Sequence, residues 1–485
     1  MRFGASVRLA ICCVLMVLAA TVAPAAVKLP AVIGDNMVLQ RGQPVPIWGW
    51  ADKGEEVTVT VAGQTVSAKA GDDGRWKVAL DKLDVGQPLE MTIKGSSGNT
   101  IALKNILVGE VWVCSGQSNM AIGVTACKNG KEETAAANHP QIRLFLVGQA
   151  QAAQPAPDVK GNWKPCTPES IAAGKPDCGG FSAAAYYFGR QLHNELKVPI
   201  GVIDTSVGGT PAEFWTSRKA LEANPALKPL AQDNSSSLYN GMIAPLIPYA
   251  IRGAIWYQGE ANVGAAFKYR TLFPAMIADW RANWGQGDFP FGFVQIAPFG
   301  YSDAWGTNPA ACAELWEAQR MTLDASPNTG MAVTVDLTAG DAIHPKNGDF
   351  NGIHPKNKQE VGRRLALWAL AKVYGRDVVY SGPIYKSMAV EGDKVRLQFD
   401  HRGSGLAARD GKALTDFTIA GDDKKFVPAV ATIDGDSVVV HSDQVAKPVA
   451  VRYAWHDTAT PNLSNKEGLP ASPFRTDRWK GVTEP

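Results

Sequence analysis

The chain has 485 residues, a length that predicts two to four domains at about 100–200 residues each and excludes a single small module. Hydrophobic residues make up 45% of it and charged residues 19%, which suits folded cores and excludes a disordered chain. The formal net charge is only +2, so neither a nucleic acid nor another electrostatic partner is indicated.

Residues 1–25 have the pattern of a secretory signal peptide. A short basic region precedes the apolar segment LAICCVLMVLAAT and the A-x-A cleavage pattern Ala23-Pro24-Ala25. The apolar segment is shorter than the roughly 20 residues that span a bilayer, and no later stretch reaches that length, so we expect no membrane span. The pattern predicts export across the inner membrane, to the periplasm or the outside.

The cysteines predict at least one free thiol. Removal of the signal peptide leaves Cys114, Cys127, Cys166, Cys178 and Cys312, an odd number in an oxidising compartment. Cys166 and Cys178 flank a Pro/Gly-rich loop, and we expect this pair to form a disulfide.

Residues 26–108 show the period-two pattern of half-buried strands. Val57, Val59 and Val61 alternate with polar residues, and after a turn Val66 and Ala68 alternate again. A further strand is expected at 75–80. The regular spacing predicts a small β-sandwich-like domain, which carries no plausible catalytic set.

Residues 109–376 alternate strand-like and helical patterns. Strands are expected at 106–114, 200–204, 253–257, 291–297 and 331–335, with helices at 181–197 and 267–284 between them. This alternation predicts an α/β domain whose parallel sheet is covered by helices. Residues 377–485 return to short Val-rich strands, such as 437–441 and 449–453, and predict a second β-domain.

Three polar motifs follow predicted strands of the α/β domain, where such sheets place their active sites. The first, Ser115-Gly116-Gln117-Ser118-Asn119-Met120, puts a serine on a strand-to-loop elbow near backbone N–H groups that could stabilise an oxyanion. The second is Ser206-Val207-Gly208-Gly209-Thr210. The third, Trp256–Asn262, gathers Gln258, Glu260 and Asn262. Taken singly, each motif is also compatible with an ordinary turn.

A fourth motif supplies two histidines. Residues 340–347 and 348–357 are near-duplicates that contain His344 and His354, and only the second copy runs directly into a helical pattern. A serine nucleophile requires such a base. Because no further His or Cys stands at ligand spacing and there is no H-E-x-x-H helix, we predict no metal site.

Together and in this order, the motifs resemble the blocks S-G-Q-S-N-M, G-G-T, W-x-Q-G-E-x-N/D and I-H-P-x-N-K of the sialate O-acetylesterase family in the SGNH-hydrolase superfamily. The resemblance covers the whole chain, since 35–41 and 47–50 are similar to that family's N-terminal β-domain and 417–421 and 468–477 to its C-terminal end. It implies an SGNH-hydrolase, flavodoxin-like catalytic domain with a parallel sheet, flanked by N- and C-terminal β-sandwich-like domains.

The resemblance also implies roles for individual residues. Ser118 is the nucleophile and His354 is the base. The backbone N–H groups of Ser118 and Gly209 form the oxyanion hole, and a side-chain amide of Gln258 or Asn262 completes it. This chemistry releases acetate from an O-acetylated sugar and needs no cofactor.

The acid that orients the histidine is open, because Asn351 and Gly352 occupy the positions where the family usually carries it. Asp349 or Glu260 could serve, or a backbone carbonyl could hold the imidazole in a Ser–His dyad. If His344 were the base, Asp341 would stand three residues before it. We favour His354, because the helix that follows gives it a rigid support.

The substrate is also open. The resemblance favours sialate esters, and an acetyl xylan esterase acting on plant polysaccharide is the alternative within enzymes. A catalytically inactive carbohydrate-binding protein is a third reading, against which the presence of both Ser118 and His354 argues. We expect the β-domains to brace the catalytic domain, and the sequence assigns neither an aromatic sugar platform nor an oligomeric state.

Overall fold

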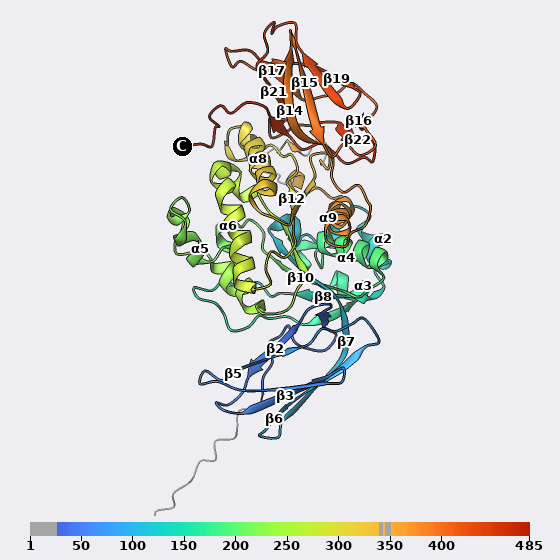
Figure 1. Cartoon of the computed structure of the whole chain (residues 1–485), viewed down its shortest axis with the longest axis vertical. Coiled ribbons are helices and arrows are strands. Elements are labelled where there is room, and N and C mark those ends of the chain that lie inside the picture. The colour runs from blue at the N-terminus through green and yellow to red at the C-terminus, as the bar shows by residue number, and fades with distance from the viewer. Residues whose placement is uncertain (1–26, 339–342, 345–350) are drawn as a thin grey trace, which may run out of the picture.

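The computed structural model describes residues 27–338, 343–344 and 351–485. The molecule is elongated, and three regions follow one another along its long axis (Figure 1): N-terminal strands, a central sheet with helices, and C-terminal strands. The predicted signal peptide, Asp341 and Asp349 lie outside the described residues.

The N-terminal strands confirm the period-two pattern. In β3, Val57, Val59 and Val61 are buried while their neighbours are not, as expected for a sheet with one solvated face. β3 lies between β4 and β6, and β2 pairs with β5, all antiparallel. The strands are β1 (Val38–Gln40), β2 (Val45–Trp50), β3 (Glu56–Val61), β4 (Gln64–Lys69), β5 (Arg75–Leu80) and β6 (Leu89–Gly95).

One long strand, β7 (Thr100–Gly116), joins the N-terminal region to the central sheet. Its first half pairs antiparallel with β6, and its second half lies between β10 and β11 in parallel. The strand therefore runs through residue 108, where the sequence places a domain boundary. Buried apolar residues of both regions form one continuous core.

The central sheet has the order β13-β12-β11-β7-β10-β8-β9. All its strands are parallel except β9, at one edge. Every residue of β10, β11 and β12 is buried, because helices cover both faces. The strands are β8 (His139–Leu146), β9 (Trp163–Cys166), β10 (Ile200–Ser206), β11 (Gly253–Tyr257), β12 (Phe291–Gln295) and β13 (Thr329–Val333). The predicted mixed α/β architecture is confirmed.

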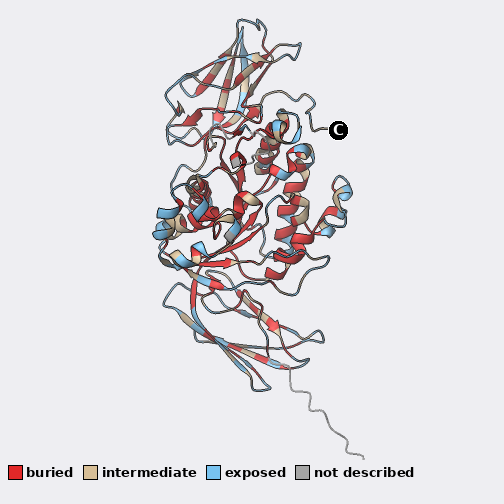
Figure 2. Ribbon diagram, turned by 180° about the vertical axis from the view of Figure 1, so that it is seen from behind, coloured by how far each residue is buried: buried red, intermediate tan, exposed pale blue. Residues whose placement is uncertain are grey.

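Two pairs of long helices flank this sheet (Figures 1 and 2). α4 (Ala183–Leu196) packs on α9 (Lys358–Lys372), and α6 (Ala266–Trp284) packs on α8 (Ala310–Ala325). Side-chain oxygens of Ser182 and Asn357 cap the first turns of α4 and α9. Shorter helices are α1 (Ser118–Ala121), α2 (Gly130–Ala135), α3 (Pro168–Ala172), α5 (Arg218–Ala223) and α7 (Tyr301–Trp305).

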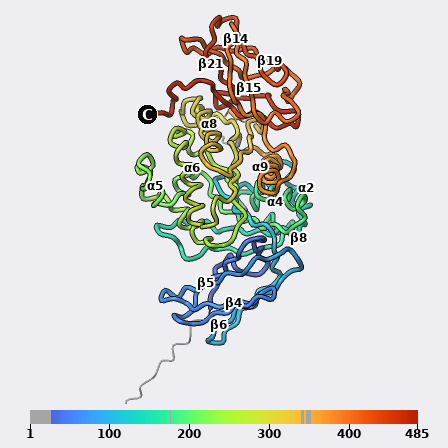
Figure 3. Tube along the Cα trace, viewed as in Figure 1, coloured from blue at the N-terminus to red at the C-terminus, as the bar shows by residue number. Residues whose placement is uncertain are grey.

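The C-terminal strands form two four-stranded antiparallel sheets and one two-stranded antiparallel sheet around a separate core. The final residues return to the central region, where the Thr483 hydroxyl donates to Glu314 (Figure 3). The strands are β14 (Ile384–Glu391), β15 (Lys394–Asp400), β16 (Leu406–Ala408), β17 (Phe417–Ala420), β18 (Val427–Pro428), β19 (Val430–Asp434), β20 (Ser437–His441), β21 (Ala450–Tyr453), β22 (Leu463–Asn465) and β23 (Phe474–Arg475).

The predicted disulfide between Cys166 and Cys178 is wrong, because both thiols are free. Cys166 ends β9 and is buried, with its sulfur directed at the Ala137 carbonyl oxygen at 3.6 Å. Burial raises the pKa of this thiol to about 12. Cys178 is only half-buried and lies in a short 3-10 turn.

Among the described residues, none of the helices has the length and apolar character needed to cross a membrane.

Candidate active site

Ser118 lies just beyond the carboxyl end of β7, at the first residue of α1. The preceding Gly116 has φ +140, and a Cβ there would lie 2.1 Å from the Tyr257 carbonyl oxygen. Only glycine therefore lets β7 approach β11 this closely before the chain turns. The Gln117 N–H donates to the same oxygen at 3.0 Å, and Ser118 is left half-buried.

His354 faces this serine. Its Nε2 lies 2.8 Å from Ser118 Oγ, although the two residues are 236 positions apart. The histidine stands between a 3-10 turn at Asn351–Ile353 and the start of α9. This distance allows the imidazole to take the hydroxyl proton. His344 lies elsewhere: its side chain is 53% exposed, and its Nδ1 is 3.8 Å from Asp303 Oδ2.

The turn after β10 lies against Ser118. A Cβ on Gly208 would be 3.5 Å from the Ser118 Cβ, and Gly209 has φ +70. β7, β10 and β11 are neighbours in the sheet, so these residues meet where parallel sheets bind ligands. Within the described chain, neither the Ser118 nor the Gly209 backbone N–H donates a hydrogen bond, which leaves both for an oxyanion.

The two amides expected in the oxyanion hole are engaged in the interior instead. Gln258 is fully buried, donates from Nε2 to Asn262 Oδ1 at 2.6 Å and accepts from the Tyr269 hydroxyl at 3.0 Å. Asn262 accepts from the Ala212 N–H and donates to Glu213. In this geometry the Gln258 amide connects the loops after β10 and β11, donating to the Thr210 carbonyl oxygen as well as to Asn262. A role for Gln258 or Asn262 in the oxyanion hole stays a prediction.

Asn119, the residue after the serine, connects three segments of the site. Its Nδ2 lies 2.5 Å from Glu260 Oε1 and 2.9 Å from the Ile353 carbonyl oxygen. Its Oδ1 accepts from Lys358 Nζ at 2.5 Å. Asn119, Glu260 and Lys358 are all buried. Because Ile353 immediately precedes His354, this network fixes the histidine relative to Ser118.

Glu260 does not reach His354. Its Oε1 is bound by Asn119, and its Oε2 has no hydrogen-bond partner among the described residues. Burial raises the pKa of this carboxyl group. Glu260 therefore does not orient His354 directly in the structure. Within the described chain no carboxylate forms an ion pair with His354, and Asp349 stays a prediction.

The electrostatic surroundings favour a neutral imidazole. Burial and, to a lesser extent, the charge of Lys358 lower the pKa of His354 to about 4. Burial also lowers the pKa of Lys358 to about 8, while its ammonium lies 4.9 Å from the centre of the Tyr257 ring, a stabilising cation–π distance. His354 is accordingly in the form that accepts a proton near neutral pH.

Sequence reasoning assigned no role to Asn119 or Lys358. Both stand in the recognised motifs, directly after Ser118 and four residues after His354. The available signal was their position next to the two catalytic candidates. Among the described residues, no group of three or more His, Cys, Asp or Glu side chains is arranged to hold a metal ion.

Comparisons with known proteins find similar sequences and a similar structure. The family model described as carbohydrate esterase, sialic acid-specific acetylesterase matches residues 108–366. The sialate O-acetylesterase of Rattus norvegicus is 31% identical to the chain, over 87% of this chain and 88% of its own length. The sialate O-acetylesterase of Homo sapiens is also 31% identical, over 91% of this chain and 91% of its own length. A carbohydrate acetylesterase from Xanthomonas citri has a similar structure, with a TM-score of 0.83 and 40% identity over 94% of this chain and 100% of that one.

Proposed function

Because the chain belongs to the sialic acid-specific acetylesterase family of carbohydrate esterases, we propose that it removes O-acetyl groups from a carbohydrate by Ser–His catalysis. The observation that carries the proposal is the 2.8 Å contact between His354 Nε2 and Ser118 Oγ at the carboxyl end of the central sheet. The matched family model extends over both of these residues.

The acylation step uses groups already in place. His354 Nε2 takes the Ser118 proton while Oγ attacks the acetyl carbonyl carbon. The oxyanion that forms accepts hydrogen bonds from the backbone N–H groups of Ser118 and Gly209, and one such donor contributes about 2.7–4 kcal/mol to the transition state. His354 then gives its proton to the departing sugar oxygen.

Deacylation repeats these steps with water. His354 takes a proton from a water molecule, which attacks the acetyl-Ser118 ester. The same N–H donors stabilise the second oxyanion. Collapse of this intermediate releases acetate and returns the proton to Ser118.

The imidazolium formed in each step needs a partner on Nδ1. We assign this role to Asp349, with a backbone carbonyl oxygen as the alternative, because Glu260 is bound to Asn119 instead. Asp349→Asn should lower kcat by at least tenfold if the carboxylate holds the imidazole. An unchanged kcat in Asp349→Asn would favour the dyad.

We propose a sialate ester as the substrate and keep one alternative. Sialate esters are favoured by the names of the curated relatives. Acetylated plant polysaccharide is the alternative, since the similar structure is named only as a carbohydrate acetylesterase. We also propose export to the periplasm or outside, from the pattern of residues 1–25. Fractionation of cells that express the full chain tests this location.

Acetate release by the purified protein tests the activity. Wild type and Ser118→Ala are compared on O-acetylated sialic acid and on acetylated xylo-oligosaccharides. Release by wild type that Ser118→Ala abolishes supports the proposal, and the faster substrate identifies the sugar. Absence of release from both substrates by folded wild type would overturn it.

A further inference from the structure

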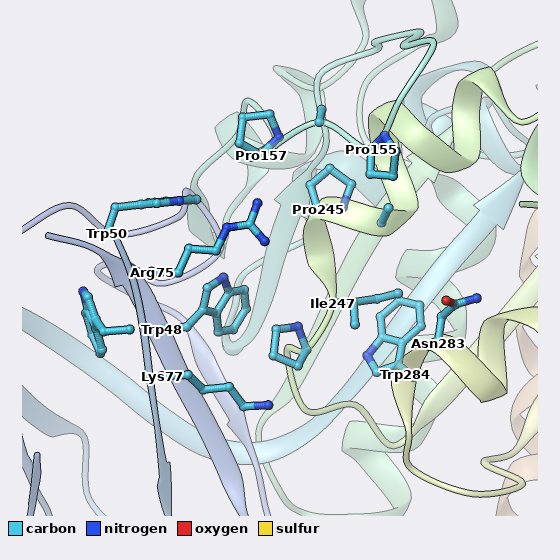
Figure 4. A pocket seen from close by; sticks show the side chains of 14 residues that line it. Trp48, Trp50, Arg75, Lys77, Pro155, Pro157, Pro245, Ile247, Asn283 and Trp284 are labelled. Carbon is cyan, nitrogen blue, oxygen red and sulfur yellow. The ribbon is translucent and has the colours of Figure 1, made fainter. Parts of the chain in front are cut away.

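A cleft that Ser118 does not line lies between the N-terminal strands and the central region (Figure 4). Its volume is about 530 Å³, within the range of small-ligand sites. One wall carries Trp48, Trp50, Arg75 and Lys77. The other includes Pro248, which precedes β11, and Trp284, which ends α6 before β12. The cleft is thus at the amino ends of the parallel strands, opposite the candidate active site.

Strand register places the four N-terminal residues on one face. β2 and β5 are antiparallel, with Trp48 opposite Lys77 and Trp50 opposite Arg75. Residues paired in this way point to the same side of a sheet. Trp76 points to the other side and is only 2% exposed, whereas Trp48 and Trp50 are half-buried. The two indoles therefore face the cleft, as Figure 4 shows.

The cations of this wall are largely unneutralised. Asp73 is the carboxylate nearest to Arg75, at 3.8 Å, and both side chains are about two-thirds exposed, at 65% and 67%. Lys77 forms no ion pair with any described residue. Lys28 pairs with Trp50 in an antiparallel bridge, so a third cation lies on the same face. Within the described chain it too lacks an ion-pair partner.

Arg75 and Lys77 are the charged side chains among the residues that line the cleft, and no acid lines it within the described chain. Asp158 follows Pro157 but does not line the cleft, and its carboxylate accepts hydrogen bonds from the Ala31 and Val159 N–H groups. The cleft therefore combines flat aromatic surface with excess positive charge.

We propose that this cleft binds an acidic oligosaccharide. The CH groups of pyranose rings pack on the faces of Trp48 and Trp50, where the π electrons are concentrated. The sugar carboxylates pair with Arg75, whose guanidinium can bind a carboxylate through two hydrogen bonds, and with Lys77. The inference rests on the proposed function in one respect, that a glycan is the ligand. Because the cleft is remote from Ser118, it retains a glycan chain on the protein and takes no part in the chemistry.

Isothermal titration calorimetry on the whole Ser118→Ala chain tests the proposal without turnover. The probes are an α2,8-linked sialic acid tetramer, tetragalacturonic acid and neutral xylotetraose. At least one acidic tetramer should bind ten or more times more tightly than xylotetraose. The acid that binds more tightly distinguishes a sialic acid source from a uronic acid source.

Variants locate the binding. Trp50→Ala and the double variant Arg75→Gln/Lys77→Gln should each weaken binding of the acidic tetramer at least tenfold. Lys94→Gln, which removes an exposed cation from β6 of the same region, should not change it. Trp50→Phe keeps an aromatic face if the alanine variant does not fold, and should retain most of the affinity. Absence of binding, equal binding of xylotetraose, or affinity unaltered in the cleft variants would overturn the proposal.

Hydrolysis of a small ester, p-nitrophenyl acetate, separates this inference from the proposed function. Variants in the cleft should hydrolyse it at the wild-type rate. Binding of acidic tetramer by a wild type that releases no acetate would remove the proposed activity and leave the cleft in place. Acetate release without binding at the cleft would remove the proposed binding site and leave the proposed activity in place.

Discussion

Removal of the Asn119 side chain should damage the active site more than it damages the fold. Asn119 makes hydrogen bonds to the buried Glu260 carboxylate, the buried Lys358 ammonium and the Ile353 carbonyl. A hydrogen bond to a charged group contributes about 1.5–3 kcal/mol. Two such bonds together contribute at most about 3–6 kcal/mol. In Asn119→Ala a water molecule or a direct contact between Glu260 and Lys358 can replace part of this, so we expect the free energy of unfolding to fall by about 3 kcal/mol.

The effect on catalysis has a different origin. Without Asn119 the Ile353 carbonyl is no longer held, and His354 moves relative to Ser118. A displacement of about 1 Å can lower the rate about 100-fold, so kcat for acetate release should fall about 100-fold with a small change in KM. Urea denaturation and initial rates measure the two quantities on the same preparation.

Asn462→Ala is the matched control. Asn462 is likewise buried and donates to Asp410 and the Ala413 carbonyl oxygen, but it lies in the C-terminal region, just before β22. It should lose stability and keep the wild-type kcat. A wild-type kcat in Asn119→Ala, or an equal loss of kcat in Asn462→Ala, would refute the positioning role.

Three further predictions concern pH, backbone and redox state. Because the pKa of His354 is lowered to about 4 from 6.5, kcat/KM should stay constant as the pH falls and decrease only below about pH 4. Lys358→Gln removes a positive charge and should shift this decrease to higher pH. A decrease that begins near pH 6.5 in wild type would contradict this. Between about pH 4 and 6.5 the unfolded chain binds a proton at His354 that the native chain does not bind. The free energy of unfolding should therefore rise with pH over this range, and the rise should be smaller in His354→Gln. Gly209 has φ +70, a conformation that costs an ordinary residue about 1–2 kcal/mol. Gly209→Val should therefore lower kcat about tenfold, and Gly209→Asn should lower it much less, because asparagine tolerates this conformation. Equal losses of kcat in the two variants would contradict the argument. Since Cys166 and Cys178 are unbridged, dithiothreitol should leave the Tm unchanged, and a drop of several degrees would show a disulfide.

Much of the fold could be predicted because it depends on local patterns. β11 was expected at 253–257 and is found there, since a fully buried strand is a continuous apolar run bounded by breaks. β8 (His139–Leu146) was not identified, because its polar first half carries no such pattern. The strand β7 crosses an expected boundary, since its sequence stays strand-like from one sheet into the next.

The site was harder to predict, because its contacts join distant positions. Asn119 meets Glu260 and Lys358 across separations of 141 and 239 residues, which no spacing rule reports. The disulfide was wrong for a related reason, as loop spacing does not give the direction of a side chain. The aromatic face of Trp48 and Trp50 likewise became visible only with the strand pairing of β2 and β5.

Labelling of Ser118 by a fluorophosphonate tests the central claim most directly. This probe forms a covalent phosphonate ester with an activated serine hydroxyl, and peptide mass spectrometry identifies the modified residue. We expect a single adduct on the peptide that contains Ser118, formed rapidly in wild type and at least 100 times more slowly in His354→Ala. An adduct on another serine, or labelling of Ser118 at the same rate without His354, would contradict it.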